Sequence, residues 1–372
     1  MKTTTLTRRE LNRATLARQM LLERRKTTAL RAVEALVGLQ AQLARPPFIG
    51  LWTRIEGFRR DGLIRLLRRR EVVRGTAMRG TLHLMSARDF ATLRPALEPV
   101  LSHAMRSVLR DRARGFDLDR VVAAAKAFFD EEPRTFEALR GHLARLHPRG
   151  DARAMGYAVR MHLPLVQVPT EAAWGYPGTA DFAAAETWLG RPLAADPAPH
   201  ALVLRYLAAF GPATAADAQA WSGHPGLGET FEDLRPNLRS FRDERGRELF
   251  DLPRAPRPAA TTVAPVRFIP EYDNLVLSHA DRTRLVADEH RSSIYTANLI
   301  IPPTFLVDGF VAGTWRVERS RKTATLLVEP FDTLPSKARE GLALEGSRLV
   351  RFIEDDAGAH DVRFSKPGLR RS

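Results

Sequence analysis

The sequence of 372 residues contains no cysteine. Disulfides, zinc sites built on thiolates and cysteine nucleophiles are therefore excluded. The ten histidines are scattered without an HExxH-type spacing, so we expect no bound metal. A Walker loop and the glycine pattern of dinucleotide-binding proteins are also absent from the sequence, and we expect no cofactor.

Long hydrophobic runs are missing as well. No stretch approaches the roughly 18 uninterrupted apolar residues of a membrane span. The first ten residues lack the apolar core of a signal peptide, so we expect a cytoplasmic protein without a membrane partner. The hydrophobic fraction of 44% is high enough for packed cores, and the length leaves room for two or three domains.

Acidic residues are scarce in the first third of the chain. Residues 1–115 hold 25 Lys and Arg against 9 Asp and Glu, a net charge of +16. The whole chain has a net charge of +15, so the remaining residues sum to −1. Such a concentration of positive charge indicates a polyanionic partner, and nucleic acid is the polyanion that we expect.

The first helices of the chain have clear start signals. Thr7 and Glu10 have the spacing of a capping box, which predicts a helix to about residue 25. A second helix begins near Thr28 and repeats apolar residues at helical spacing. The Pro-Pro pair at residues 46–47 prevents that helix from continuing and favours an extended conformation at Arg45.

A hairpin follows these helices. A short helix is expected over residues 63–70, then strands over 72–77 and 81–85 around a turn at residues 79–80, and a capping box at Ser86. Helices followed by a small hairpin are typical of the winged helix, a helix-turn-helix variant. Residues 1–115 are therefore predicted to form a first winged-helix unit.

The same pattern recurs twice, which predicts a tandem array. The second unit covers residues 116–195, with helices at 135–146 and 152–162 and strands at 165–168 and 173–176. The third covers residues 196–255, with helices at 200–210, 215–221 and 229–239 and strands at 240–242 and 247–252.

The chain changes character after a linker rich in proline and alanine at residues 253–265. Residues 264–365 are predicted to form a small β-rich, barrel-like domain, with Asp308-Gly309 as a hairpin turn. Its strands are expected at residues 266–269, 275–277, 304–307, 311–317 and 324–328. A basic tail at 366–372 is expected to fray. The predicted fold class is thus α+β, with three winged-helix units followed by this domain.

The most informative feature is the pair Gln40 and Gln42, which flank Ala41 just after an apolar helical stretch. Each amide offers two donors and an acceptor that need partners, so glutamine is an unusual choice for packing. Residues i and i+2 lie about 200° apart on a helix but share a side in an extended segment. Both can face one ligand only if the helix ends near residue 39 or 40. Taken alone, the pair also fits a solvated helix end.

With this motif and layout, the chain resembles the AlkZ-type winged-helix DNA glycosylases of bacteria. The resemblance covers nearly the whole chain and is strongest at Gln40-Ala41-Gln42, at MRGTLHLM (residues 78–85) and at PEYDNLVLSHADR (residues 270–282). A related branch has Gln-apolar-Asp, so two glutamines place the chain closer to the antibiotic self-resistance branch. The small Ala41 is a mild departure from the motif.

The resemblance implies a concave basic surface for duplex DNA and excision of N7-alkylated purines, including bulky adducts and crosslinks. Gln40 and Gln42 would be the catalytic residues. Glutamine is neither acid nor base near neutral pH, but its carbonyl can orient a water molecule. That suffices if the leaving group is already activated, because a cationic alkylpurine departs as a neutral base without protonation. We therefore expect a monofunctional, monomeric glycosylase that acts on cationic N3- or N7-alkylpurines, not on uracil, and does not cleave the strand.

Further candidates for DNA contact lie in and around the quoted stretches: Arg45, Arg68, Arg69, Arg79, His83, His279 and Arg282. The run at residues 68–70 can equally be a solvated face, and His83 can be a wing residue on the polar face. For His279, Asp281 and Arg282, a buried salt-bridge role and a DNA-contact role remain open. Asp273 is a turn residue or a group near the sugar. Trp52 and Phe58 are expected in the core of the first unit.

Two other functions fit a chain of this kind. A winged-helix transcriptional regulator would bind DNA without catalysis, but regulators usually dimerise, and no heptad pattern or dimerisation helix is evident. A structural or damage-sensing DNA-binding protein is the third possibility. Preference for an operator sequence would favour the regulator, whereas preference for alkylated or abasic sites would favour the two repair functions.

Overall fold

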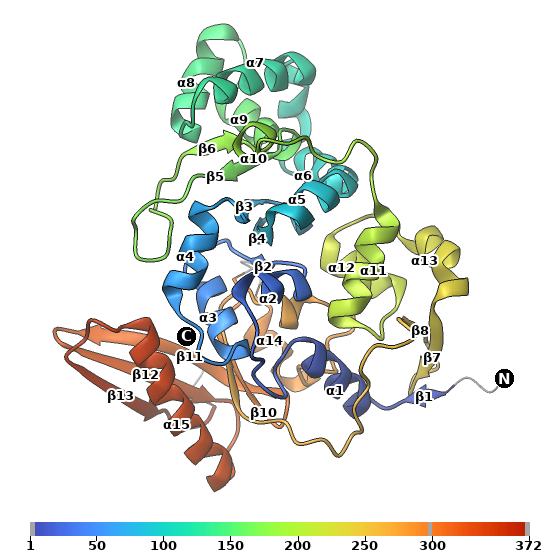
Figure 1. The fold of residues 1–372 in the computed structure, drawn as a ribbon, viewed down its shortest axis with the longest axis vertical. Helices are drawn as coiled ribbons and strands as arrows, with labels where there is room; N and C mark the ends of the chain where they lie inside the picture. Colours follow the sequence, from blue (N-terminus) through green and yellow to red (C-terminus); the bar gives the residue numbers. More distant parts are fainter. Residues whose placement is uncertain (1–3, 297–299, 369–372) are drawn as a thin grey trace.

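The computed structural model describes residues 4–296 and 300–368 (Figure 1). Within them the chain forms three sheets, and in each sheet some strands are joined by tight turns while others are separated by helices. The first third of the chain lies at the centre, the second unit lies at one end of the long axis, and the C-terminal sheet lies at the other end (Figure 1). The glutamine segment is therefore central, with later parts of the chain around it.

Helix α1 (Arg8–Arg18) begins with the predicted capping box, in which Thr7 N donates to Glu10 Oε2 at 2.8 Å. The helix ends at Arg18, earlier than predicted. Met20 adopts a left-handed φ of 56°, and Leu21 N donates to Leu16 O at 2.9 Å, which closes the helix. The length prediction was wrong because residue 20 takes the terminating conformation without being glycine.

Helix α2 (Ala29–Ala35), capped by Thr28, ends in the same way at Val37 and Gly38. Strand β2 (Leu39–Gln40) follows, and helix α3 (Pro46–Arg54) then begins on the Pro-Pro pair. The extended conformation predicted for Arg45 was wrong. Its φ and ψ are −71° and −43°, because its carbonyl already accepts the first helical bond from Phe48 N at 3.1 Å.

The predicted hairpin is present. Helix α4 (Arg60–Arg68) leads into β3 (Val72–Thr76) and β4 (Leu82–Ser86), joined through a 3₁₀ turn at Met78–Gly80. Ser86 then caps helix α5 (Ala87–Leu93) by accepting from Asp89 N at 3.1 Å. Strands β2, β4 and β3 lie side by side, so the hairpin packs directly against the glutamine segment.

The second unit confirms two predicted helices and corrects one predicted strand. Helix α6 (Glu98–Leu109) still belongs to the first unit, and the elements of the second are α7 (Leu118–Glu131), α8 (Phe136–Leu146), α9 (Ala152–His162), β5 (Leu165–Gln167), β6 (Phe182–Ala184) and α10 (Ala185–Leu189). Residues 173–176 form no strand, since Gly175 has a φ of 77° and closes a turn onto Ala172 O. Strands β5 and β6 extend the first sheet, whose order is β2-β4-β3-β5-β6.

The third unit contains α11 (Pro199–Phe210), α12 (Ala215–Ser222), α13 (Gly228–Leu234), β7 (Arg239–Asp243) and β8 (Glu248–Asp251). The helix predicted over residues 229–239 stops at Leu234, and a 3₁₀ turn with Pro236 at its centre follows. Strand β1 (Thr5–Leu6) pairs with β7 and forms one edge of this sheet, whose order is β1-β7-β8.

The predicted linker at residues 253–265 has no regular element, and it packs along α1, where Arg9 Nε donates to Ala260 O at 2.8 Å. The C-terminal part contains β9 (Arg267–Ile269), α14 (Arg291–Ile294), β10 (Thr304–Val307), β11 (Phe310–Ser320), β12 (Thr323–Pro330), α15 (Ser336–Ile353) and β13 (Ala359–Phe364). Asp308-Gly309 makes the expected hairpin turn, with φ of 49° and 84°.

Two predictions for this part were wrong. Residues Asn274–Leu277 form a 3₁₀ turn instead of a strand, since the Asp273 side chain accepts from Leu275 N and starts a turn. The sheet is open: in the described part of the chain its order is β13-β12-β11-β10-β9, and α15 covers one face, so it is not a closed barrel (Figure 1). Of the tail at 366–372, residues 369–372 lie outside the described residues.

Candidate functional site

Gln40 lies on an extended strand, and Gln42 lies in the bend that follows it. Helix α2 ends at Ala35, and β2 pairs with β4 so that Gln40 lies opposite His83. Ala41 N then donates to Leu82 O at 2.7 Å, which continues the pairing by one residue. The motif is thus an edge of the central sheet followed by a bend over residues 42–45.

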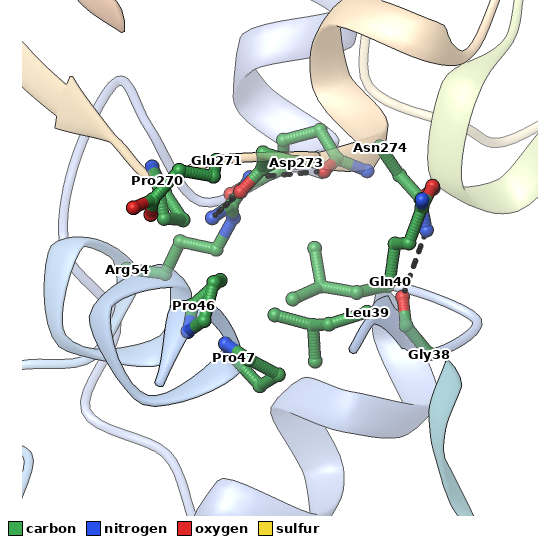
Figure 2. Close-up of a pocket in the computed structure, with 12 residues that line it drawn as sticks. Gly38, Leu39, Gln40, Pro46, Pro47, Arg54, Pro270, Glu271, Asp273 and Asn274 are labelled. Carbon is green, nitrogen blue, oxygen red and sulfur yellow. Dashed lines mark hydrogen bonds and ion pairs between the residues drawn. The ribbon is translucent and has the colours of Figure 1, made fainter. Parts of the chain in front are cut away.

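Gln40 is buried and held by an arginine. Arg79 Nη2 donates to Gln40 Oε1 at 2.7 Å and to Asn274 Oδ1 at 2.9 Å. Asn274 in turn donates to Gly38 O at 3.4 Å, beside Gln40 (Figure 2). Residues of all three stretches that carry the family resemblance therefore meet at this point.

Arg79 owes its position to the hairpin turn, where its φ is 55°. Its Nη1 donates to the carbonyl oxygen of Trp221 on α12. Burial, together with the charge of Arg282, lowers the pKa of Arg79 to about 10, so the guanidinium stays protonated at neutral pH. Arg79 fixes the Gln40 amide from behind and does not lie on an open DNA-facing surface.

Gln42 is exposed and faces a different space. Its Oε1 accepts from Leu82 N at 3.4 Å, which is a long contact. It lines a groove of about 900 Å³ between the first and second units, whereas Gln40 lines a cavity of about 10 Å³ behind the sheet edge (Figure 2). The structure thus places the two glutamines on one segment but not around one open pocket.

We call the larger space the arginine groove. Its charged lining consists of Arg45, Arg74, Arg140, Arg153 and Arg160 with one carboxylate, Glu137. Tyr157, Trp174 and Tyr176 add aromatic surface. Only Arg45 was a candidate from the sequence. The others lie on β3, α8, α9 and the loop after β5, so no local pattern in the sequence marks them as one group.

Arg74 joins the groove to the motif. It is buried on β3, and it donates to Ala41 O at 2.8 Å and to Gln42 O at 3.1 Å. Burial is the main reason that the pKa of Arg74 falls to about 10, and the charge of Arg160 lowers it further. The backbone of the glutamine segment is therefore held from the groove side by one guanidinium.

Asp273 has the role of a turn residue and ion-pair partner. Its two carboxylate oxygens accept from Arg54 Nη1 and Nη2, both at 2.9 Å, and both side chains are buried (Figure 2). Both oxygens of this carboxylate are therefore engaged by one guanidinium, in the bidentate geometry typical of arginine and carboxylate pairs. Asp273 also accepts from Leu275 N at 2.9 Å, which agrees with the turn-residue alternative.

Both candidate histidines are buried, which corrects the expectation of DNA contact. His83 is fully buried, its Nδ1 lies 3.1 Å from Thr81 O, and burial with the charge of Arg79 lowers its pKa to about 3. His279 contacts Phe210 O through Nε2 at 3.1 Å, and burial with the charge of Arg284 lowers its pKa to about 3. Both are neutral packing residues at neutral pH.

The remaining candidates are dispersed. Arg282 stacks on Tyr295 at 3.9 Å, and Asp281 forms ion pairs with Arg245 and Arg247, which is the salt-bridge alternative. The outer arginines of α4 are exposed away from the groove: Arg68 pairs with Glu171, and Arg69 lies 4.0 Å from Glu71. Arg45 lies at the mouth of the groove, 3.5 Å from Glu271.

Trp52 and Phe58 are half-buried instead of lying within the core of the first unit, because both rings pack at its border against Phe352 of α15. Among the described residues, no group of three or more His, Asp or Glu side chains is arranged to hold a metal ion. In the same part of the chain, every helix is too short or too polar to cross a membrane.

Comparisons with known proteins agree with this layout. A family model described as "DNA glycosylase AlkZ-like" matches residues 33–352. An "Interstrand DNA cross-link repair glycosylase" from Streptomyces sahachiroi is 27% identical over 369 residues, covering 89% of this chain and 93% of that protein. The solved structure of Streptomyces sahachiroi DNA glycosylase AlkZ superposes with a TM-score of 0.77 at 22% identity, covering 97% of this chain and 100% of that one. The model spans most of the chain, including the glutamine motif and the arginine groove, and the protein therefore belongs to the AlkZ-like DNA glycosylase family.

Proposed function

We propose that this protein is a monofunctional DNA glycosylase that removes cationic N7-alkylguanine and N3-alkylpurine bases from duplex DNA. A water molecule attacks the sugar C1′, and Gln42, supported by Gln40, positions that water. The observation that carries this proposal is the exposed Gln42 amide at the wall of a groove lined by five arginines. A polyanionic strand in that groove would bring its sugars next to the amide.

Hydrolysis of the bond to a cationic base needs few catalytic groups, which agrees with the side chains that line the groove. Ordinary glycoside hydrolysis needs one carboxylic acid to protonate the leaving group and one carboxylate to activate water. Here Asp273 is engaged by Arg54, and Glu137 is the only carboxylate of the described residues that lines the groove. An alkylated purine that already carries a positive charge leaves as a neutral base, so a positioned water is sufficient.

The two glutamines contribute differently in this proposal. Gln42 is exposed, and its Oε1 has one long contact, so its carbonyl can accept a hydrogen bond from the attacking water. Gln40 accepts a bond of 2.7 Å from Arg79 and keeps the edge strand, and hence Gln42, at a fixed distance from the groove. No lysine is required for a Schiff base, so strand cleavage by the protein is not expected.

We extend the substrate range to bulky adducts and interstrand crosslinks. The groove offers about 900 Å³ and is open to solvent, so a modified base does not have to enter a closed pocket. The curated relative is named as a crosslink-repair glycosylase, which supports this range. The protein would act as a monomer, with the groove between the first two units binding the duplex.

The test is base release from defined duplexes. The wild-type protein should release 7-methylguanine from methylated DNA and leave uracil-containing DNA unchanged, because uracil is not a cationic leaving group. Gel analysis without alkali should show intact strands. Release of uracil at a comparable rate would contradict the chemistry. Sequence-specific operator binding, with no release of methylated or bulky adducts, would support the regulator instead.

A further inference from the structure

The arginine groove contains four neighbouring side chains that have no role in the base excision proposed for Gln40 and Gln42. We call Arg74, Arg160, Gln167 and Tyr176 the groove cluster; all four line the groove. Gly75 on β3 pairs antiparallel with Val166 on β5, so Arg74 lies opposite Gln167 on the same face of the sheet. The Tyr176 ring centroid lies 4.9 Å from Arg74 Cζ.

The arginines of this cluster have no counter-charge. Within residues 4–296 and 300–368, neither the buried Arg74 nor the half-buried Arg160 forms an ion pair with a carboxylate. Two other buried arginines are paired, Arg54 with Asp273 and Arg18 with Asp251 at 2.8 Å, whereas the buried Arg284 is held by the backbone oxygen of Pro212. A buried cation without a partner is costly, and an incoming anion would offset that cost.

Buried polar atoms in the same wall lack partners too. The Tyr176 hydroxyl and Gln167 Oε1 make no hydrogen bond, although their residues are only 6% and 9% exposed. Arg160 Nε is also buried and unpartnered. Most buried polar groups in proteins are hydrogen-bonded, so three exceptions in one wall indicate a place prepared for a polar ligand.

The charge and the donors fit a phosphate group. Two guanidinium groups and a hydroxyl supply N–H and O–H donors, and the Gln167 amide can present its NH₂ to an oxygen after rotation. Arg74 uses Nε and Nη2 on the carbonyls of Ala41 and Gln42, which leaves Nη1 to donate into the groove. A phosphate bound there would be linked to the glutamine segment through a single guanidinium.

We propose that the groove cluster binds one phosphodiester group of the lesion-bearing strand and thereby sets the position of the sugar relative to Gln42. Arg160, Gln167 and Tyr176 hold the phosphate, and Arg74 is the positioning residue that couples it to the Gln42 backbone. This inference rests on the proposed function only for the identity of the strand; phosphate binding itself does not require base excision.

The experiment neutralises one phosphate at a time. Duplexes with a single tetrahydrofuran abasic analogue, which fixes the register of binding, carry one methylphosphonate linkage at successive positions around it. Wild-type protein should lose about tenfold in affinity at one linkage, the loss expected for a charge-assisted contact. Arg160→Gln should bind the unmodified duplex about tenfold more weakly and show no further loss at that linkage.

Arg145→Gln is the matched control, because Arg145 is exposed on α8 and does not line the groove. It removes the same charge and should keep the wild-type sensitivity to the modified linkage. The slope of log affinity against log salt should fall by about 0.9 for Arg160→Gln and stay unchanged for the control. Equal losses at every linkage in all proteins would overturn the proposal.

Arg74→Lys tests the coupling. Lysine keeps the positive charge for phosphate but cannot donate in parallel to two carbonyls. For Arg74→Lys we expect an affinity for DNA within a few-fold of wild type and single-turnover base release at least tenfold slower. For Arg160→Lys we expect both the affinity and the release rate to return from the Arg160→Gln values toward those of wild type. Parallel loss of affinity and rate in Arg74→Lys would refute the coupling. If that variant does not fold, the methylphosphonate comparison still decides phosphate binding.

Two further outcomes separate this inference from its alternatives. Sub-millimolar binding of inorganic phosphate, lost in Arg160→Gln and without any linkage-specific effect in DNA, would assign the cluster to a free phosphate and overturn the proposal. The binding measurements use DNA without a releasable base. A protein that releases no base would therefore contradict the proposed function while the methylphosphonate result stands by itself.

Discussion

At the scale of single residues, arginines hold the motif in place. Arg79 fixes the Gln40 side chain, Arg74 fixes the carbonyls of Ala41 and Gln42, and Arg54 binds Asp273 beside them. Guanidinium groups donate in fixed directions and stay charged when buried, so they suit this positioning role better than lysine would. Glycoside hydrolysis ordinarily uses a free carboxylic acid or carboxylate, but here the carboxylate of Asp273 forms an ion pair with Arg54.

The Arg54–Asp273 pair should be important for stability. Asp273→Asn removes the carboxylate and leaves a buried guanidinium unpaired, which we expect to cost about 3–5 kcal/mol of unfolding free energy. Asp61→Asn is the control, because Asp61 and Arg59 are 67% and 83% exposed and 4.0 Å apart, and it should change little. Urea denaturation checks both; an equal effect of the two substitutions would contradict the packing role.

The two buried histidines predict a loss of stability in mild acid. Their folded pKa values of about 3 lie below the unfolded value of 6.5, so the unfolded state binds more protons as the pH falls. Stability is therefore full above pH 6.5 and declines from there toward pH 3, by about 2 kcal/mol per histidine at pH 5. Urea unfolding at pH 7 and pH 5 measures this. His83→Leu should lose about half of the difference, and an unchanged difference would count against a neutral His83.

At the scale of elements, local capping and turn chemistry could be predicted from the sequence, because it depends on a few adjacent residues. Thr7, Thr28 and the Asp308-Gly309 turn behave as their patterns predict. Tertiary contacts were not predictable. Helix α15 was missed, because the sheet that it packs against is formed by strands far along the chain; the turn at residues 274–277 was missed although its cause, the Asp273 side chain accepting from Leu275 N, is local.

Gly38, which joins α2 to β2, is the residue between elements on which the glutamine motif depends most. Its φ is +85°, and a Cβ there would lie 2.9 Å from Leu84 O and 2.8 Å from Met85 Cγ. Gly38→Ala should destabilise the protein by at least about 1–3 kcal/mol and lower base release, because it pushes β2 away from β4.

Gly62→Ala is the comparison variant. Gly62 lies inside α4 with nothing within 4 Å of an added Cβ, so alanine should stabilise the protein by about 0.5–1 kcal/mol and leave base release unchanged. Urea denaturation and the single-turnover rate check both variants. A harmless Gly38→Ala would contradict the close approach of β2 and β4.

At the scale of the whole molecule, the basic surface is assembled from two units. The excess of positive charge in residues 1–115 pointed to a polyanion, and Arg45 and Arg74 of that segment do line the groove. Arg140, Arg153 and Arg160 come from helices of the second unit. They could not be identified from the sequence, since they converge only when β5 joins the first sheet.

Charge reversal across the groove tests this assembly. Arg140→Glu combined with Arg153→Glu should weaken binding to undamaged duplex DNA by at least tenfold and flatten its salt dependence, because two phosphate contacts are lost. Arg145→Glu combined with Arg149→Glu changes the net charge equally at exposed positions outside the groove. Fluorescence anisotropy at several salt concentrations measures both. Equal weakening by the two pairs would mean that overall charge, not the groove, governs binding.

The most direct test of the central claim is single-turnover release of 7-methylguanine by wild type and Gln42→Ala, with Thr179→Ala as a groove-lining control. Gln42 is exposed, so its replacement should leave the urea midpoint and the affinity for duplex DNA unchanged. The account predicts a fall of about 100-fold or more in the release rate for Gln42→Ala and none for Thr179→Ala. Release by Gln42→Ala at the wild-type rate would contradict it.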